Sequence, residues 1–151
     1  MQYERFASYE LTYAALAAAT GSSQQSFQVE SNYDFWWIKA EAFVYDAAGL
    51  GVSRLQWPNL EVLISEGASN QQLMNQAVSL NSIFGSGEIP YILPRPHTIQ
   101  GGSTLTATVY NKHTTTAYSA RLCFSGVLKL RGAPVAGAVE ASTFRRRRRA
   151  A

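Results

Sequence analysis

The chain has 151 residues, of which 46% are hydrophobic, and its only cysteine is Cys123. This length supports one domain with a real core, and a single cysteine excludes an intrachain disulfide framework and a cysteine-rich zinc site. The net charge of +3 depends on five arginines at 145–149; the remaining 8 basic residues face 10 acidic ones, which leaves the body at −2. The charge therefore argues against a globally basic nucleic-acid binder.

The sequence also contains no run of about 18 apolar residues, which is the length needed to cross a bilayer. Its first residues, Met1 to Arg5, lack the basic region and apolar core of a secretory signal. We therefore expect a soluble product made in the cytoplasm, with no membrane partner.

The N-terminal residues 2–20 fit two patterns. An Ala-rich stretch at 13–19 has good helix formers, whereas alternation over 5–13 favours a strand, which is the structure we expect. Residues 21–26 are polar and predict a turn, and residues 27–30 then alternate as a short strand.

The most aromatic stretch, residues 34–46, has the period of two that predicts a strand. One set of alternate residues is apolar and is predicted to face the core: Trp36, Ile38, Ala40, Ala42 and Val44. The other set places four aromatic residues around a Lys/Glu pair: Phe35, Trp37, Lys39, Glu41, Phe43 and Tyr45. Because a solvated face normally carries fewer aromatic residues, we expect the N-terminal segment or a neighbouring subunit to cover it. The strand is long, so we also expect a bend or bulge between Lys39 and Glu41.

Three further strands are predicted after this one. Residues 60–65 and 103–111 alternate, the first with Leu60, Val62 and Ile64 inward and the second with Leu105, Ala107 and Val109 inward. A turn at 111–114 leads to the partner strand at 117–131, in which Gly126 suggests a bulge. Residues 66–84 show no clear period.

Prolines mark residues 85–102 as a long connection, since each proline removes a hydrogen-bond donor and restricts the residue before it. This connection and the aromatic face of residues 34–46 offer more contact surface than a monomer keeps wet, so we expect a homo-oligomer. Five aromatic residues are the interface candidates: Phe35, Trp37, Phe43, Tyr45 and Tyr91.

Short strands without a long helix predict an all-β fold, an antiparallel β-sandwich or jelly roll, over residues 1–131 with an N-terminal arm. Residues 132–151 are predicted to be a flexible tail that ends in the arginine block. The predicted core comprises Trp36, Ile38, Val44, Leu60, Val62, Leu105, Val109, Leu122 and Phe124.

The sequence predicts no catalytic, metal-binding or cofactor-binding residue. His97 and His113 lie in loops without a nucleophile at suitable spacing, so they are interpreted as surface histidines. Asp34 and Asp46 are too far apart along a strand for paired acid and base work, and are expected to cap its ends. Cys123 is interpreted as a packing residue or an ordinary thiol.

The arginine block is the one strong charge feature: Arg145, Arg146, Arg147, Arg148 and Arg149. Five adjacent guanidinium groups bind phosphate or an acidic surface with strong salt dependence, so DNA or an acidic partner is one hypothesis and a merely solvated tail is the other. The exposed aromatics have a further interpretation as a sugar-binding platform.

Six groups of motifs between residues 27 and 131 form a further pattern: Tyr33-Asp34-Phe35-Trp36-Trp37-Ile38, residues 67–75, Leu80-Asn81-Ser82-Ile83-Phe84-Gly85, Ile89-Pro90-Tyr91 with Pro94 and Pro96, Gly102-Ser103-Thr104-Leu105 with Asn111, and Leu122-Cys123-Phe124-Ser125-Gly126. Through these motifs the chain resembles small β-sandwich structural proteins of tailed-bacteriophage virions. The resemblance implies a non-enzymatic, oligomeric component of the head, collar or head–tail junction, with capsid, portal or adaptor proteins as partners. It implies a virion location after synthesis in the host cytoplasm. A capsid decoration or cement protein, a carbohydrate-binding module and a nucleic-acid-binding accessory protein are the alternatives.

Overall fold

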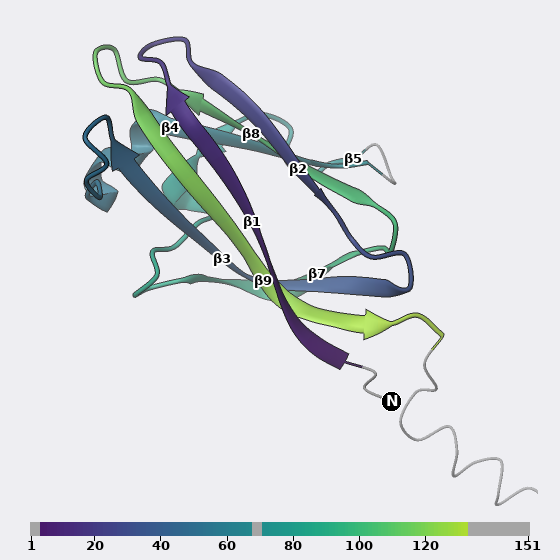
Figure 1. Cartoon of the computed structure of the whole chain (residues 1–151). Helices are drawn as coiled ribbons and strands as arrows, with labels where there is room; N and C mark the ends of the chain where they lie inside the picture. The colour runs from purple at the N-terminus through teal and green to yellow at the C-terminus, as the bar shows by residue number, and fades with distance from the viewer. Residues whose placement is uncertain (1–3, 68–70, 133–151) are drawn as a thin grey trace, which may run out of the picture.

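Two antiparallel sheets lie face to face in the computed structural model, which describes residues 4–67 and 71–132 (Figure 1). The first sheet has the order β1 (Glu4–Leu16), β9 (Tyr118–Leu130), β3 (Tyr33–Asp46) and β7 (Tyr91–Ile99). The second has the order β2 (Ser22–Gln28), β8 (Thr104–Asn111), β4 (Leu60–Glu66) and β5 (Gln71–Gln72), and β6 (Val78–Ser79) also pairs with β4. Two short 3₁₀ helices, η1 (Arg54–Asn59) and η2 (Leu80–Ser82), join the strands.

The chain crosses between the sheets at nearly every connection. Strands β1, β3, β7 and β9 belong to the first sheet, whereas β2, β4 and β8 belong to the second. A four-stranded sheet of order β1-β9-β3-β7 facing a five-stranded sheet that contains the order β2-β8-β4-β5 forms a jelly roll. The predicted all-β antiparallel sandwich is confirmed, and the jelly-roll form of it is the one adopted.

Strand β3 contains a bulge at Ile38. Trp37 pairs with Gly126 and Lys39 pairs with Ser125, so Ile38 is an extra residue in the ladder. One extra residue reverses which side chains face inward. The bulge lies next to the predicted position, but its effect on the strand's inward face was not foreseen.

Because of the bulge, the predicted inward face of β3 is correct beyond Ile38 and wrong up to and including it. Phe35 and Trp37 are buried before it, and Ala40, Ala42 and Val44 are buried after it. The prediction that Trp36 and Ile38 belong to the core is therefore wrong, because both are only half-buried and lie outside the buried cluster. The outward placement of Phe35 and Trp37 is wrong for the same reason.

Gly126 lies opposite the bulge and not within one of its own. A Cβ atom there would stand 1.9 Å from the carbonyl oxygen of Trp36, so any other residue would force the two strands apart. The indole N–H of Trp37 donates to the carbonyl of Lys39 at 2.9 Å. The bulge thus depends on the lack of a side chain at Gly126 in β9, and the Trp37 indole in β3 stabilises it.

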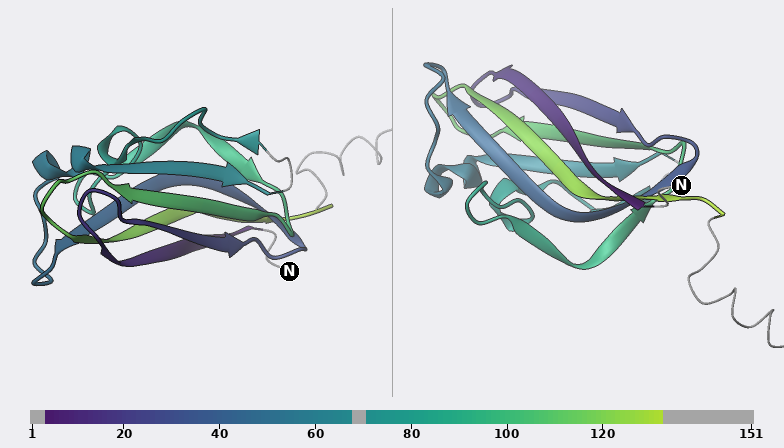
Figure 2. Two further views of the ribbon diagram at one scale, coloured as in Figure 1. Left: turned by 90° about the horizontal axis from the view of Figure 1, so that it is seen from above. Right: turned by 60° about the horizontal axis from the view of Figure 1, so that its bottom comes forward.

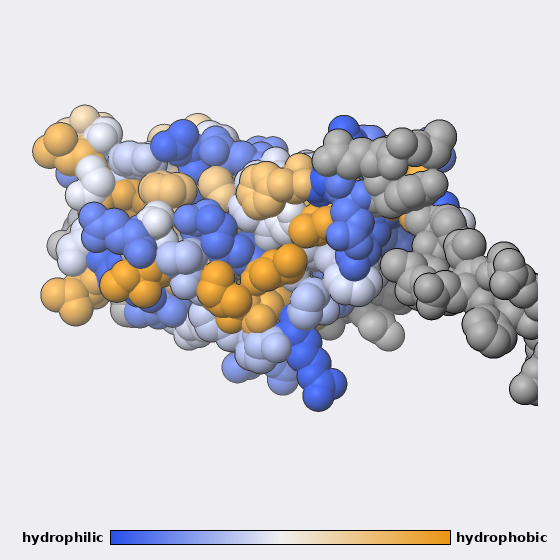
Figure 3. All heavy atoms as spheres, turned by 90° about the horizontal axis from the view of Figure 1, so that it is seen from below, coloured by the Kyte–Doolittle hydropathy of each residue, from blue (hydrophilic) through white to orange (hydrophobic). Residues whose placement is uncertain are grey.

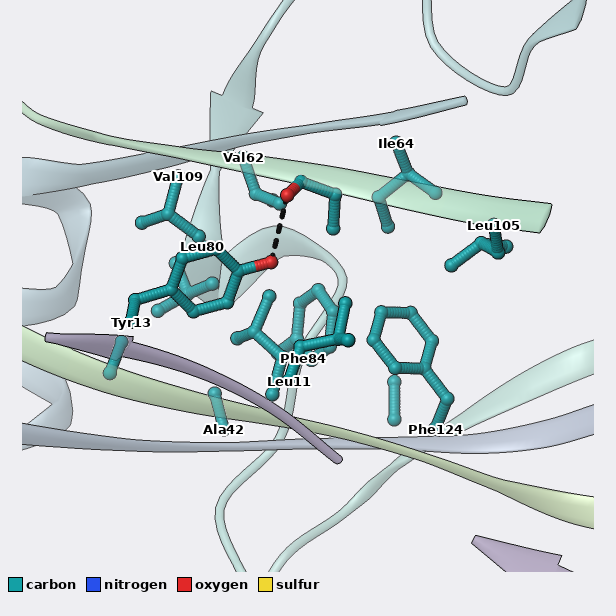
Figure 4. Close-up of a cluster of buried hydrophobic side chains, with 14 of the residues drawn as sticks. Leu11, Tyr13, Ala42, Val62, Ile64, Leu80, Phe84, Leu105, Val109 and Phe124 are labelled. Atoms are coloured by element: carbon teal, nitrogen blue, oxygen red, sulfur yellow. Dashed lines mark hydrogen bonds between the residues drawn. The ribbon is translucent and has the colours of Figure 1, made fainter. Parts of the chain in front are cut away.

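The core fills the space between the sheets (Figure 4). Seven of the predicted core residues are buried: Val44, Leu60, Val62, Leu105, Val109, Leu122 and Phe124. The ring of Phe124 contacts those of Phe27, Trp37 and Phe84, with centroids 5.1–5.6 Å apart. The hydroxyl of Tyr13 in β1 donates across the core to the carbonyl of Ala107 in β8 at 2.8 Å.

Two segments predicted as connections are strands. Residues 22–28, assigned largely to a turn, form β2 because their backbone pairs with β8 although most of their side chains are exposed. Residues 91–99 form β7 at the edge of the first sheet. In β7, Ile92 pairs with Lys39 of β3 and His97 pairs with Trp37, so four residues of β7 lie opposite the single residue Ile38. These four residues include Pro94 and Pro96, and they bulge away from β3. An edge strand tolerates prolines in such a place.

The predicted pairing of the last two strands is also wrong. Strand β8 pairs with β2 and β4, and β9 pairs with β1 and β3. Asn111 fixes this change of sheet, because its buried side chain donates to the carbonyls of Leu16 and Thr116 and accepts from the amide of His113. A buried amide with these bonds joins the ends of both sheets.

The sandwich has two distinct ends (Figure 2). At one end lie η1 and the connections at 17–21 and 112–117; we call it the η1 end. At the other lie the connections at 29–32 and 100–103, the start of β1 and the last described residue, Gly132; we call it the tail end.

Candidate interaction surface

An aromatic and charged cluster covers the outer face of β3 beyond the bulge. The guanidinium of Arg121 lies over the rings of Phe43 and Tyr45, at 5.6 and 5.5 Å from their centroids. It also donates to the Tyr45 hydroxyl at 2.7 Å and forms an ion pair with Glu10 at 3.7 Å. The hydrogen bond to Tyr45 and the nearby carboxylate raise the pKa of Arg121. This face of the first sheet therefore presents rings and a permanent positive charge together.

Among the five predicted interface aromatics, two are not available to a partner. Phe35 and Trp37 are buried between the sheets, since the bulge turns them inward. Phe43, Tyr45 and Tyr91 are half-buried at the surface. Their role in an interface remains a prediction.

A second apolar patch lies on the same outer face, toward the tail end. Phe6 in β1 pairs with Val127 in β9, which pairs in turn with Trp36 in β3. Phe6 is 73% exposed, and the ammonium of Lys129 lies 3.5 Å from the centroid of the Trp36 ring. Lys129 also pairs with Glu4 at 2.9 Å, so charge shields part of this patch.

The η1 end carries three large apolar side chains in contact with solvent. Leu50, Leu55 and Ile89 are 66%, 89% and 67% exposed. Figure 3 shows hydrophobic surface at this end of the molecule and on the middle of the same face. Each of the three residues is next in the chain to one that lines a single pocket: Leu50 precedes Gly51, Leu55 follows Arg54, and Ile89 follows Glu88.

That pocket has a volume of about 320 Å³. Its walls come from β3, from residues 51–57 and from the loop 86–88. Phe43, Tyr45, Val52 and Trp57 supply most of the apolar lining, and Arg54 and Glu88 supply the charges. The size falls at the lower limit of pockets that bind small ligands or single side chains.

Local hydrogen bonds hold the exposed leucines in place. The carboxylate of Asp46 accepts from the amides of Ala48 and Leu50, each at 2.9 Å, which confirms its predicted capping role. The hydroxyl of Ser53 accepts from the amide of Leu55 at 3.4 Å and caps η1. The capping role of Asp46 was predicted from the sequence, whereas the cap at Ser53 and the pocket beside it were not.

Glu66 and His97 link the two sheets on the side where β4 faces β7. The His97 ring nitrogen lies 3.2 Å from the Glu66 carboxylate, and the Glu66 side chain is nearly buried. The His97 ring also packs edge-on against Trp37. The interpretation of His97 as a surface histidine is therefore incomplete, because it supports a buried carboxylate.

The remaining candidates for chemistry in the described ranges are the Cys123 thiol and any cluster of potential metal ligands. Burial, with Glu10 nearby, raises the pKa of Cys123 to about 11, so its thiol stays protonated and weakly nucleophilic near neutral pH. Within residues 4–67 and 71–132, no three potential ligands gather at a place that suits a metal ion. In the same part of the chain, no helix has the length and apolarity to span a membrane.

The arginine block at 145–149 lies outside the described residues. The described chain stops at Gly132, at the tail end and away from the η1 end (Figure 1). Its predicted contact with DNA or an acidic partner therefore remains a prediction.

No family model matches the chain, and no curated protein matches it. A solved structure of the infectious bursal disease virus VP2 subviral particle is 13% identical, with a TM-score of 0.40 over 86% of this chain and 34% of that chain. The structure of the Gx strain of infectious bursal disease virus is 12% identical, with a TM-score of 0.40 over 88% and 35%. The chain thus spans about a third of the length of those chains. At these TM-scores the likeness carries no argument about function.

Proposed function

We propose that this chain is a non-enzymatic structural protein of a virion and that it assembles as a homo-oligomer. The observation that carries the proposal is a jelly roll with large apolar side chains exposed together at one end. Jelly rolls recur in viral capsid domains, and exposed apolar patches mark surfaces that a partner covers. A fold alone does not fix a function, so the exposed patch is the stronger of the two supports.

The finer role is a component of the head, collar or head–tail junction of a tailed bacteriophage. Its support is the resemblance of residues 27–131 to small structural proteins of such virions. Capsid, portal or adaptor proteins are its expected neighbours, and a capsid decoration role is the alternative. The protein would be made in the host cytoplasm and end in the virion.

The arginine block would give the assembled protein a second contact. The last described residue, Gly132, lies at the tail end of the sandwich, opposite the η1 end. Each neutralised phosphate releases counterions, so DNA is the partner that five arginines suit best. Both contacts are compatible in one particle.

The experiment is a sedimentation series on the full-length protein, combined with electron microscopy of the associated fraction. The proposal expects closed oligomers or particles whose population grows with concentration. A protein that stays monomeric at every concentration and does not join a virion particle contradicts it. Thermal stabilisation of that monomer by a sugar panel would support the carbohydrate-binding alternative.

A further inference from the structure

The pocket at the η1 end is formed by segments distant in the sequence and is open to solvent. Phe43 and Tyr45 come from β3, Val52 and Trp57 from the following connection, and Gly87 from the loop after η2. A Cβ atom on Gly87 would stand 3.1 Å from the Phe43 ring, so the loop lies directly on that ring. The space, about 320 Å³, equals that of about ten bulk water molecules and easily holds an aliphatic side chain.

The side chain best placed to fill such a pocket is Leu55. It is 89% exposed, the most exposed of the large apolar residues in the described chain. It directly follows Arg54, which lines the pocket of its own molecule. A projecting residue beside the pocket of its own chain can exchange reciprocally with a second copy, because one two-fold axis near the rim brings each residue to the other pocket.

Charges on the rim fit the same arrangement. Arg54 and Glu88 both line the pocket and are both exposed. Arg54 lies over the Trp57 ring at 5.5 Å, but neither residue has an ion-pair partner within the described ranges. Because both charges lie on one rim, a two-fold axis beside it can bring the Arg54 of one copy to the Glu88 of the other. Such a pairing makes the surface complementary to itself in charge.

We infer that two copies of this chain meet at their η1 ends, with Leu55 of each inserted into the pocket walled by Phe43, Tyr45 and Val52 of the other. Leu50 and Ile89 flank the contact, and their side chains become buried when it forms. The inference rests on the proposed function, because it names the partner and the surface through which the oligomer forms. It also leaves the tail ends of both copies free for other contacts.

The test is sedimentation equilibrium of the full-length protein and of Leu55→Glu. Two inserted leucines are lost per dimer, and each is worth about a tenfold change or more, so self-association should weaken about a hundredfold. Phe6→Glu is the matched control, since it places the same charge on an exposed apolar residue outside the contact. Because Leu55 and Phe6 are both exposed, both variants should keep the melting temperature of the parent chain at concentrations where all three are monomeric.

Charge reversal distinguishes this specific contact from nonspecific hydrophobic association. Arg54→Glu and Glu88→Arg should each weaken association, and the double variant should restore it. Equal association of Leu55→Glu and the parent chain overturns the inference and leaves the proposed oligomer standing, and failure of the double variant to recover overturns the two-fold pairing. A parent chain that never associates instead overturns the proposed function itself.

Discussion

Two leucines show how differently this chain uses its apolar residues. Leu122 in β9 is fully buried between the sheets, whereas Leu55 in η1 is 89% exposed. Burying a leucine stabilises a fold by about 1.5–3 kcal/mol, so Leu122 contributes to folding and Leu55 barely does. The free energy of removing Leu55 from water is still available to a partner. Buried residues of the core thus stabilise the fold, whereas exposed apolar residues of the η1 end are available for association.

The largest expected effect on stability comes from Leu122→Ala, which truncates the buried leucine. Truncating a buried leucine removes its burial and leaves a cavity, so the free energy of unfolding should fall by about 2–5 kcal/mol. Leu55→Ala is the matched control and should change it by less than about 0.5 kcal/mol. Urea unfolding of both variants measures the difference, and similar losses for the two would contradict these separate roles.

The link between the sheets predicts an intermediate effect. His97→Ala removes the partner of the nearly buried Glu66 carboxylate, and leaving a buried polar group unsatisfied costs roughly 1–3 kcal/mol. Lys112→Ala is the control, because its pair with Glu61 is exposed and should contribute within about 0.5 kcal/mol. Denaturant midpoints compare them. Equal losses would show that the Glu66–His97 pair behaves as a surface contact.

Alkaline pH should lower the free energy of unfolding by a smaller amount. Burial raises the pKa of Cys123 from 9.0 to about 11 and also raises the pKa of Tyr13. In both cases the folded state prefers the protonated group. The contribution of Cys123 is complete below pH 9 and is lost as pH rises toward 11, whereas that of Tyr13 is complete below pH 10 and starts to fall only above it. Unfolding midpoints measured from pH 8 to 11 should therefore fall. In Cys123→Ser that fall should be smaller, and an unchanged pH profile would contradict the role of the thiol.

The smallest effect on stability is expected from deleting residues 142–151. The segment is poor in large apolar residues apart from Phe144, so the melting temperature should stay nearly unchanged. DNA binding should instead lose salt dependence, since five phosphate contacts correspond to a slope of up to about 4.5 in log affinity against log salt. Identical salt series for both proteins would make the arginines bystanders, and loss of folding would make the tail structural.

The core was predictable wherever a strand keeps strict alternation. Leu60 and Val62 in β4, Leu105 and Val109 in β8, and Leu122 in β9 all follow the period of two. Trp36 and Ile38 were misplaced because a single unpaired residue reverses the period, and the sequence pattern does not reveal where the ladder inserts it. Strand β2 was missed for a different reason, because pairing with β8 holds a polar segment that has no apolar period.

The candidate surface was predictable only in part. Phe43 and Tyr45 follow from the alternation of β3, but their pocket also needs Val52 and Gly87, which only the tertiary structure brings beside them. Leu55 is one apolar residue in a polar connection, and nothing in its neighbours distinguishes a buried leucine from an exposed one. A surface assembled from separate connections depends on the fold, so a sequence pattern can indicate its individual residues but not that they lie together.

Hydrogen exchange at two protein concentrations tests association through the η1 ends most directly. The full-length chain should be compared below and above its association midpoint, with exchange followed segment by segment. If two copies meet at their η1 ends, exchange should be slower at residues 50–57 and 85–89 in the associated sample and unchanged in the paired strands of the core. Association without slower exchange at these two segments, or slower exchange confined to the tail end, would contradict association through the η1 ends.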